Sequence, residues 1–267
     1  MKASDYVASA ARHVIVYGGP KTGKTELVGT LAEKYRLHWF SLDGGIKTLF
    51  RPDSAARKHL DNIELYNIPD SQIFPVAVET MLKVLKSGKH NICHKHGKVS
   101  CPACKEPGMF STYSPDELTV DKDVVVIDHY SQLMDSVVNY IHKDALSKDN
   151  WDGIKSNYDD WAKQGAMSDR FGSVIQNAPY NVVVISHEVL TELEDGTKKI
   201  APVGGTRNKS SDFARYFDDV VYTEIVGGEY KAQVAAVDKT RTIIGTRSGK
   251  SLKAEKGKQV SLLDLFK

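Results

Sequence analysis

The eight residues GGPKTGKT, Gly18 to Thr25, constrain the fold of this 267-residue chain more than any other stretch. They match the spacing G-x-x-x-x-G-K-[ST] and lie between an apolar run, HVIVYG, and a segment of helical character. Glycines at these positions let backbone N–H groups point inward, and the positive end of the following helix completes an anion site. The predicted phosphate-binding residues are Gly18, Gly19, Pro20, Lys21, Thr22, Gly23, Lys24, Thr25 and Glu26.

Two side chains of this loop and one distant carboxylate have distinct expected roles. Lys24 would reach the β and γ phosphates of ATP, and the Thr25 hydroxyl would bind Mg²⁺. The run DVVVID ends in Asp128, at the carboxyl edge of a buried strand, where doubly wound folds bind their ligands. Its carboxylate would hold the same Mg²⁺ through water. The sequence therefore predicts a site for ATP and Mg²⁺.

Apolar runs bounded by turn residues alternate with segments of helical period, a pattern typical of an α/β protein. Their continuous valines and isoleucines favour a mostly parallel sheet covered on both faces. A hairpin is expected at Asp195-Gly196, and two strands around Gly227-Gly228 would form an antiparallel edge. The expected buried strands are 13–18, 37–43, 63–68, 123–128 and 180–186.

A helix is expected between the last two of these strands. Apolar residues recur there every three to four positions, from Ile154 through Tyr158 and Trp161 to Phe171 and Ile175. We interpret the aromatic residues of this stripe as core packing.

Composition excludes several classes of protein. The net charge of +2 is too small to indicate nucleic-acid binding over the whole surface, so any basic surface would be local. No segment approaches the roughly 20 apolar residues of a membrane span, and the N-terminus lacks the apolar run of a signal peptide. The three cysteines argue against a secreted disulfide framework, so we expect a cytoplasmic protein without a membrane partner.

In their order along the chain, the motifs resemble those of the phage-encoded RecA-like ATPases. This AAA-type phage nucleotide-binding family includes the ATP-dependent Sak-type single-strand annealing proteins. The stretches that carry the resemblance are YGGPKTGKTEL, FSLDGG, VVVIDHYSQL, WDGIKSNYDDW, VVVISHE with the hairpin after it, and VDKTR. The resemblance implies a RecA-like core that assembles as a ring or filament on single-stranded DNA, in the host cytoplasm, during recombination, annealing or replication. A single-strand-binding protein or another replication factor would be a further partner.

The resemblance also implies roles for residues outside the phosphate loop. Asp43, at the end of the second strand, occupies the position at which RecA-like ATPases carry the glutamate that activates water. Because the side chain of aspartate is shorter than that of glutamate, we expect slow turnover. The alternative is that Asp43 only caps the turn before Gly44. His187, at the end of the fifth strand, would sense the γ-phosphate. Lys239 and Arg241 in VDKTR would reach a neighbouring subunit's γ-phosphate. Arg247 is a further candidate for this role. The alternative is that these residues are only a basic run on the surface.

A basic, glycine-bearing segment, APVGGTRNKSSDFARYF, follows the predicted hairpin. We expect a mobile loop in which Arg207, Lys209 and Arg215 contact DNA phosphates. A solvated turn is the alternative interpretation.

All three cysteines lie in one short stretch of the chain, NICHKHGKVSCPAC. Cys93-x-x-His96 and Cys101-x-x-Cys104 form two pairs, each with a two-residue gap that lets both members reach one Zn²⁺ ion. His90 and His94 are alternative fourth ligands, and a disulfide or scattered thiols are the other interpretations. We expect a structural zinc site, because so small an insertion needs a metal to hold one shape.

The expected organisation is a RecA-like ATPase core at 1–248, interrupted by a zinc-knuckle insertion at 89–108 and followed by a basic tail at 249–267. The tail closes in SLLDLFK, a partner-docking peptide or a last strand. Two other functions stay open: a nucleotide-gated DNA-binding module with little hydrolysis, and a kinase of nucleotides or other small molecules.

Overall fold

The computed structural model describes residues 11–70, 74–106, 108–148, 156–192, 196–234, 241–253 and 260–267. The main sheet has the strand order β10-β9-β1-β7-β6-β2-β3, and β8 and β11 pair with β7 and β9 at its sides. Its strands are β1 (His13–Gly18), β2 (Arg36–Ser41), β3 (Ile63–Asn67), β6 (Asp123–Asp128), β7 (Asn181–Glu192), β8 (Lys198–Pro202), β9 (Asp219–Val226), β10 (Glu229–Gln233) and β11 (Gly245–Thr246). The five predicted strands are confirmed.

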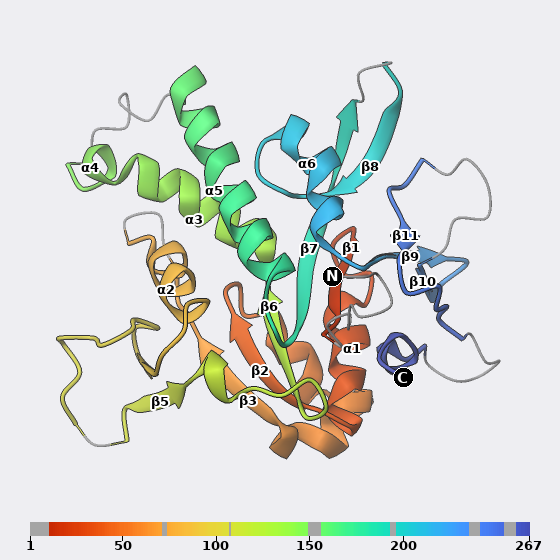
Figure 1. The fold of residues 1–267 in the computed structure, drawn as a ribbon, viewed down its shortest axis with the longest axis horizontal. Coiled ribbons are helices and arrows are strands. Elements are labelled where there is room, and N and C mark those ends of the chain that lie inside the picture. The colour runs from red at the N-terminus through yellow and green to blue at the C-terminus, as the bar shows by residue number, and fades with distance from the viewer. Residues whose placement is uncertain are drawn as a thin grey trace, which may run out of the picture.

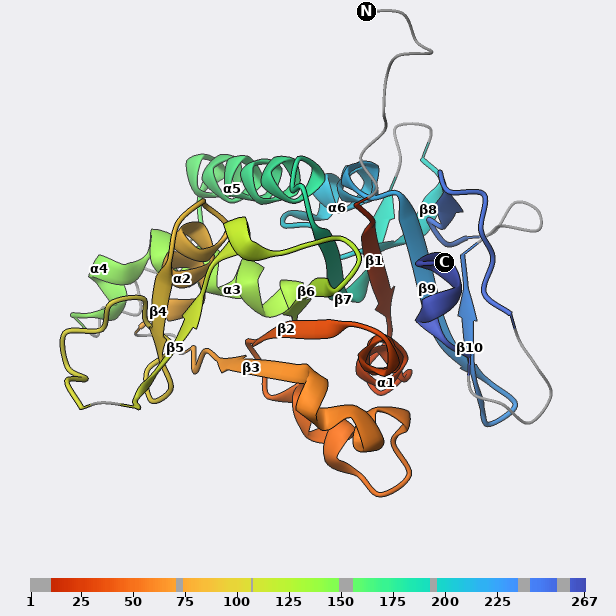
Figure 2. The ribbon, with the colours of Figure 1, turned by 60° about the horizontal axis from the view of Figure 1, so that its bottom comes forward.

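Helices cover both faces of this sheet, as Figure 2 shows with α3 and α5 on one side and α1 on the other. The α-helices are α1 (Lys24–Gly29), α2 (Val76–Val84), α3 (Tyr130–Ile141), α4 (Lys143–Leu146), α5 (Tyr158–Gln176) and α6 (Arg207–Phe213). Strand β1 alternates between two cores, with Ile15 and Tyr17 in one and Val14 and Val16 in the other. This period of two on a strand buried on both sides explains its uninterrupted apolar run.

The carboxyl-terminal half of the sheet differs from the expectation in one respect. Strand β9 runs parallel to β1, and only β10 and β11 are antiparallel to β9. The two strands around Gly227-Gly228 are therefore a parallel addition followed by an antiparallel edge. The hairpin between β7 and β8 is confirmed: Gly196 has a positive φ of 78°, whereas Asp195 lies outside the described residues.

The aromatic stripe of α5 is only partly in the core, which corrects the sequence interpretation. Phe171 and Ile175 are buried, but Tyr158 is 81% exposed and Trp161 is 55% exposed. Periodicity indicates which residues share a helix face, but not whether another element covers that face along its whole length. Ile154 lies outside the described residues.

The closing SLLDLFK is neither a strand nor a free peptide. It forms a short 3₁₀ helix at Leu262–Leu265, and Leu262 and Leu265 are fully buried with Val28 and Leu31 beneath the sheet. The Leu262 N–H donates to Thr30 Oγ1 at 3.0 Å. These residues of the predicted basic tail therefore belong to the core.

The cysteine-bearing insertion forms a separate two-stranded sheet of β4 (His90–Cys93) and β5 (Phe110–Tyr113), seen at the lower left of Figure 1. It extends past the expected boundary at residue 108. The Thr80 hydroxyl of α2 donates to the Gly97 carbonyl at 2.8 Å, and Ile92 and Tyr113 enter the main core. The insertion is thus packed onto the sheet.

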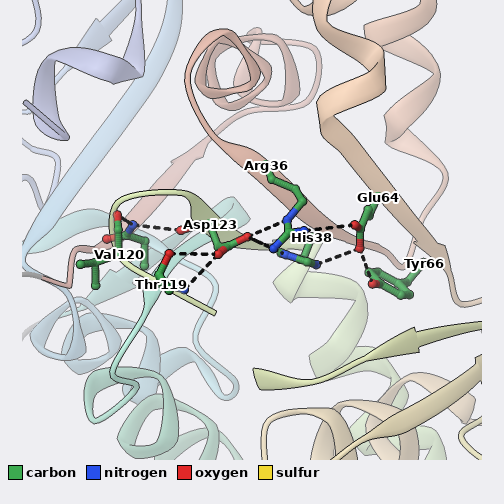
Figure 3. Close-up of polar contacts among 8 residues, drawn as sticks. Arg36, His38, Glu64, Tyr66, Thr119, Val120 and Asp123 are labelled. Atoms are coloured by element: carbon green, nitrogen blue, oxygen red, sulfur yellow. Dashed lines mark hydrogen bonds and ion pairs between the residues drawn. The ribbon is translucent and has the colours of Figure 1, made fainter. Parts of the chain in front are cut away.

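A polar network ties β2, β3 and β6 together at their amino ends, opposite the edge that carries the phosphate loop (Figure 3). The Arg36 guanidinium donates to Asp123 Oδ1 at 2.7 Å, and His38 lies between Asp123 and Glu64, 3.2 Å from each. Burial acts to raise the pKa of Asp123, but bonds from the Thr119 N–H, Arg36 and His38 leave it below the ordinary value. Asp123 therefore stays ionised and holds the strand starts in register.

Candidate nucleotide-binding site

The phosphate loop connects the end of β1 to the start of α1. Gly18 and Gly23 have positive φ angles of 156° and 84°, and a Cβ on Gly18 would lie 2.2 Å from the Thr223 carbonyl oxygen. Only glycine fits at Gly18, because β9 approaches the backbone so closely. Lys21 also has a positive φ of 63°, so the loop curls as a phosphate cradle requires.

Lys24 lies inside the curl of the loop. Its ammonium donates to the carbonyls of Gly18 at 3.0 Å and Gly19 at 2.7 Å, and the residue is only 5% exposed. Burial lowers the pKa of Lys24 to about 8, although Asp128, Glu188 and Asp43 oppose that shift. The ammonium is therefore largely charged at neutral pH and can exchange its carbonyl partners for phosphate oxygens. Thr25, half-buried, follows in the first turn of α1.

Asp128 is fully buried at the carboxyl end of β6. Its Oδ2 accepts a hydrogen bond from Trp39 Nε1 at 3.1 Å, while Oδ1 has no partner within the described part of the chain. Burial raises the pKa of Asp128 to about 7, and the nearby Asp43 adds to the rise. Ligand atoms of Asp43, Asp128 and His129 lie within 4.8 Å of one another. A divalent cation would relieve the repulsion between these carboxylates, so the donor set fits Mg²⁺.

His187 lies beside the loop. Its Cα pairs with that of Gly18 across β7 and β1, and its N–H donates to Ser131 Oγ at 2.9 Å. The rings of His187 and His129 are 4.0 Å apart between centroids. Burial and the Lys24 charge lower the pKa of His187. The pKa of His129 is lowered to about 2 by burial and by the nearby His187 and Lys24. Both rings are neutral at pH 7, so His187 meets a bound phosphate as a hydrogen-bonding group.

The arrangement of loop, buried lysine and strand-end aspartate agrees with the comparisons to known proteins. The chain matches the family model described as AAA domain over residues 10–256. The chain belongs to this family. It is an AAA-type, nucleotide-binding P-loop ATPase domain built on a mostly parallel sheet, and the family implies that Mg²⁺ accompanies the nucleotide.

Two solved structures are similar to this AAA domain at low sequence identity. Flagellar accessory protein FlaH from Methanocaldococcus jannaschii is 13% identical with a TM-score of 0.41; the match covers 83% of this chain and 76% of FlaH. A KaiC-like protein from Pyrococcus horikoshii is 12% identical with a TM-score of 0.38, at the same coverages of 83% and 76%. No curated protein sequence matches the chain. Among the helices in the described ranges, none has the length and apolar character needed to cross a bilayer.

The hydrogen bond of Asp43 agrees with the turn-cap interpretation, and the role of Asp43 as the base that activates water stays a prediction. Asp43 is exposed, and its Oδ1 accepts the Gly45 N–H at 2.8 Å, the bond expected of a turn cap. It also lies with Asp128 in the carboxylate group described above.

The side chain of Glu26, a predicted loop residue, is engaged elsewhere. It accepts hydrogen bonds from the Ser54 hydroxyl at 2.8 Å and the Ala55 N–H at 2.7 Å. These bonds fix α1 to the 3₁₀ segment Ala55–Asn62.

Two residues near the loop escaped the sequence analysis. Glu188, one position after His187, accepts the Tyr222 hydroxyl at 2.9 Å and approaches Gly19. Tyr230 of β10 lies against Gly23, with its ring 3.1 Å from where a Cβ would stand. Glu188 carries a local signal, because it is an acidic residue just after the predicted strand 180–186. Tyr230 carries none, because β10 comes near the loop only through the pairing of strands in the sheet.

The expected basic loop is instead the helix α6, packed against α5. Lys209 and Arg215 both pair with Asp169 of α5, at 2.8 and 3.5 Å. Arg207, at the start of α6, is exposed and has no ion pair among the described residues. Arg207 therefore differs from Lys209 and Arg215, which both have an ion-pair partner.

The structure describes only some of the residues that were predicted to reach a neighbouring subunit's γ-phosphate. Lys239 lies outside the described residues. Arg241 is exposed, and its carbonyl accepts the Ile200 N–H at 2.6 Å. Arg247 donates to the Arg215 carbonyl at 2.9 Å.

Cys93, His96, Cys101 and Cys104 converge, with one ligand atom from each within 4.8 Å of the others. The His96 Nδ1 atom lies 3.5 Å from Cys101 Sγ and 3.3 Å from Cys104 Sγ. A tetrahedral Zn²⁺ with ordinary Zn–S and Zn–N bonds separates sulfur and nitrogen by about 3.5 Å. Burial raises the pKa of Cys104 to about 11, and the neighbouring thiols add to it, so a cation is needed to hold several thiolates here. The set fits zinc.

The two alternative histidines have hydrogen-bonding partners outside the cluster. His94 Nε2 is 2.8 Å from Ser111 Oγ, and His90 Nε2 is 3.0 Å from the Lys86 carbonyl. His96 is therefore the histidine that completes the set.

Proposed function

We propose that this AAA ATPase domain hydrolyses ATP while acting on single-stranded DNA, in phage recombination, annealing or replication. The observation that supports this best is the course of β7. The strand passes the phosphate loop at His187 and continues without a break into its hairpin with β8. A single strand thus links the candidate γ-phosphate sensor to the hairpin, which extends beyond the other strands beside α6 in Figure 1.

Exposed and half-buried cations cluster around this hairpin. Lys198 is exposed on β8, with Lys199 next to it, and the Thr191 hydroxyl of β7 donates to the Arg207 carbonyl at 3.0 Å. Because Lys209 and Arg215 already share an ion pair with Asp169, the DNA contact is better assigned to Arg207 and the hairpin lysines. Each phosphate contact on a single strand contributes about 0.7 to the slope of log affinity against log salt.

The test compares ATP hydrolysis and oligonucleotide binding in the wild type and in the double variant Lys198→Gln/Arg207→Gln. We expect single-stranded DNA to stimulate wild-type hydrolysis, and the double variant, which removes two contacts, to lose about 1.4 units of salt slope with unchanged basal hydrolysis. Lys231→Gln, which removes one positive charge on the edge strand β10, is the control. Failure of the wild type to bind single-stranded DNA in any nucleotide state would refute the proposal.

A nucleotide-gated module with little hydrolysis is the second candidate. Two observations favour this module. The Gly45 N–H donates to Asp43 Oδ1, so one oxygen of that candidate base is already bonded. The residue after Asp128 is His129 and not a glutamate that could activate water. DNA binding that depends on ATP, without phosphate release, would support it.

We also propose assembly into a ring or filament in which Lys239 or Arg241 completes a neighbour's site. Electron microscopy with an ATP analogue and an oligonucleotide tests this. Particles that stay monomeric under all conditions would exclude it.

We propose further that the four-residue cluster binds one structural Zn²⁺ ion. Elemental analysis of the purified chain should find one zinc per chain, and Co²⁺ substitution should give the absorption of a tetrahedral thiolate site. Cys101→Ser should lose the metal, whereas His94→Ala should keep it. Equal metal content in the Cys101 variant and the wild type would refute this assignment.

A further inference from the structure

The carboxylate of Glu188 lies over the phosphate loop. Strand β1 ends at Gly18, whose Cα pairs with that of His187, so Glu188 is the first residue of β7 beyond the end of β1. Its Oε1 lies 3.6 Å from the position that a Cβ on Gly19 would take. Gly19 is also the residue whose carbonyl accepts the Lys24 ammonium. The carboxylate is thus beside the phosphate loop, at the residue whose carbonyl the Lys24 ammonium contacts.

One oxygen of this carboxylate is fixed by a hydrogen bond, and the other has no hydrogen-bond donor among the described residues. Tyr222, on β9 at the opposite side of β1, donates its hydroxyl to Oε2 at 2.9 Å. The Tyr222 ring packs against Tyr17 of β1, with centroids 5.2 Å apart, which holds the phenol in place. Within the described part of the chain, Oε1 accepts no hydrogen bond. A carboxylate oriented from one side and open on the other is the arrangement a general base requires.

Asp43 is less suited to that role. Its Oδ1 is occupied by the Gly45 N–H, and its carboxylate lies with Asp128 in the group that fits Mg²⁺. The electrostatic effect on Lys24 agrees with this, since Glu188 acts on the pKa of that ammonium more strongly than Asp43 does.

We propose that Glu188, rather than Asp43, activates the attacking water in ATP hydrolysis, an inference that rests on the proposed function. The water oxygen forms a bond to the γ-phosphorus while Glu188 Oε1 accepts one water proton. The bond from that phosphorus to the β–γ bridging oxygen breaks, and its electron pair stays on ADP. Glu188 then releases the proton to solvent. Asp43 supports the metal-bound waters, and Tyr222 positions Glu188.

The experiment measures steady-state ATP hydrolysis, Mg²⁺ dependence and nucleotide affinity for Glu188→Gln and Asp43→Asn. Glu188→Gln keeps an oxygen for the Tyr222 hydroxyl, so it should fold and bind Mg·ATP within about threefold of wild type, with kcat reduced by about 100-fold or more. Asp43→Asn should raise the Mg²⁺ concentration required and recover most of kcat at saturating metal. Glu192→Gln, an exposed carboxylate farther along β7, is the matched control and should behave as wild type.

Tyr222→Phe tests positioning, because it removes the hydrogen bond and keeps the ring. It should lower kcat by about three- to tenfold without a comparable change in KM. Glu188→Asp keeps the charge on a shorter side chain and should lie between wild type and Glu188→Gln.

The outcomes separate this inference from the proposed function. If the wild type hydrolyses ATP and Glu188→Gln retains its kcat within about threefold, this inference alone is overturned. A Glu188→Gln variant that loses or tightens ATP binding without losing kcat assigns Glu188 to nucleotide gating and also overturns it. A wild type without turnover, with or without single-stranded DNA, overturns both.

Discussion

Replacing Leu262 by alanine tests whether the closing residues are part of the core or a docking peptide. Leu262 is fully buried with Leu31 and Val28, and its N–H is bonded to Thr30. A fully buried Leu→Ala change costs about 2–5 kcal/mol, through lost burial and the cavity that it leaves. For a chain of this size each kcal/mol lowers the melting temperature by about 2–4 °C, so about 3 kcal/mol gives a fall of about 6–12 °C.

Urea titration followed by circular dichroism gives the free energy of unfolding, and an unchanged m-value would confirm that only stability has changed. Leu263→Ala, at a half-buried neighbour on the same turn, should cost about 1 kcal/mol because less of its side chain leaves water. If Leu262→Ala unfolds at the same urea concentration as wild type, the segment is not docked, and our account of this core is wrong.

Three further predictions concern other parts of the molecule. Since the pKa of Asp128 is about 7, the folded state binds an extra proton between pH 4 and 7, and the metal-free protein should lose stability as pH rises through that window. Asp128→Asn should abolish this slope in thermal melts, raise stability at pH 8 and eliminate Mg²⁺-dependent hydrolysis; an unchanged slope would contradict the assignment. Asp123→Asn removes the charge that Arg36 pairs with and should cost about 2 kcal/mol in denaturant titration, because a buried carboxylate loses its charged hydrogen bonds while Arg36 stays half in solvent, with nucleotide affinity retained. Gly97→Ala puts a Cβ 2.6 Å from the Ile68 Cα at a positive φ, so it should lower zinc content and the melting temperature; a variant with full zinc content would refute this.

The residues predicted for the phosphate site are those whose signals are local. The loop, the strand before it and Asp128 were identified because a glycine-rich turn and continuous apolar runs have meaning within a few residues. The structure brings Lys24, Asp128, Asp43 and His187 to one edge of the sheet, as the ends of parallel strands require.

The errors arose where a local pattern has two tertiary outcomes. An apolar stripe predicts a helix face but not whether another element covers it, and so Trp161 was wrongly placed in the core. A basic, glycine-bearing segment can be a loop or a helix, and here Asp169 on α5 pairs with Lys209 and Arg215 of the α6 region. Glu188 was passed over because its partner Tyr222 is 34 residues away in the chain.

The sequence alone determined the phosphate loop, the buried strands and the three cysteines of the Cys-His cluster, because each depends on residue spacing within a short segment. The tertiary structure decided that His96 completes that cluster, that Leu262 reaches Thr30 across 232 residues, and that Glu188 faces the loop. These outcomes depend on which distant segments become neighbours. Packing of the whole sheet and its two helical layers sets those neighbours, and no short stretch of the chain contains that information.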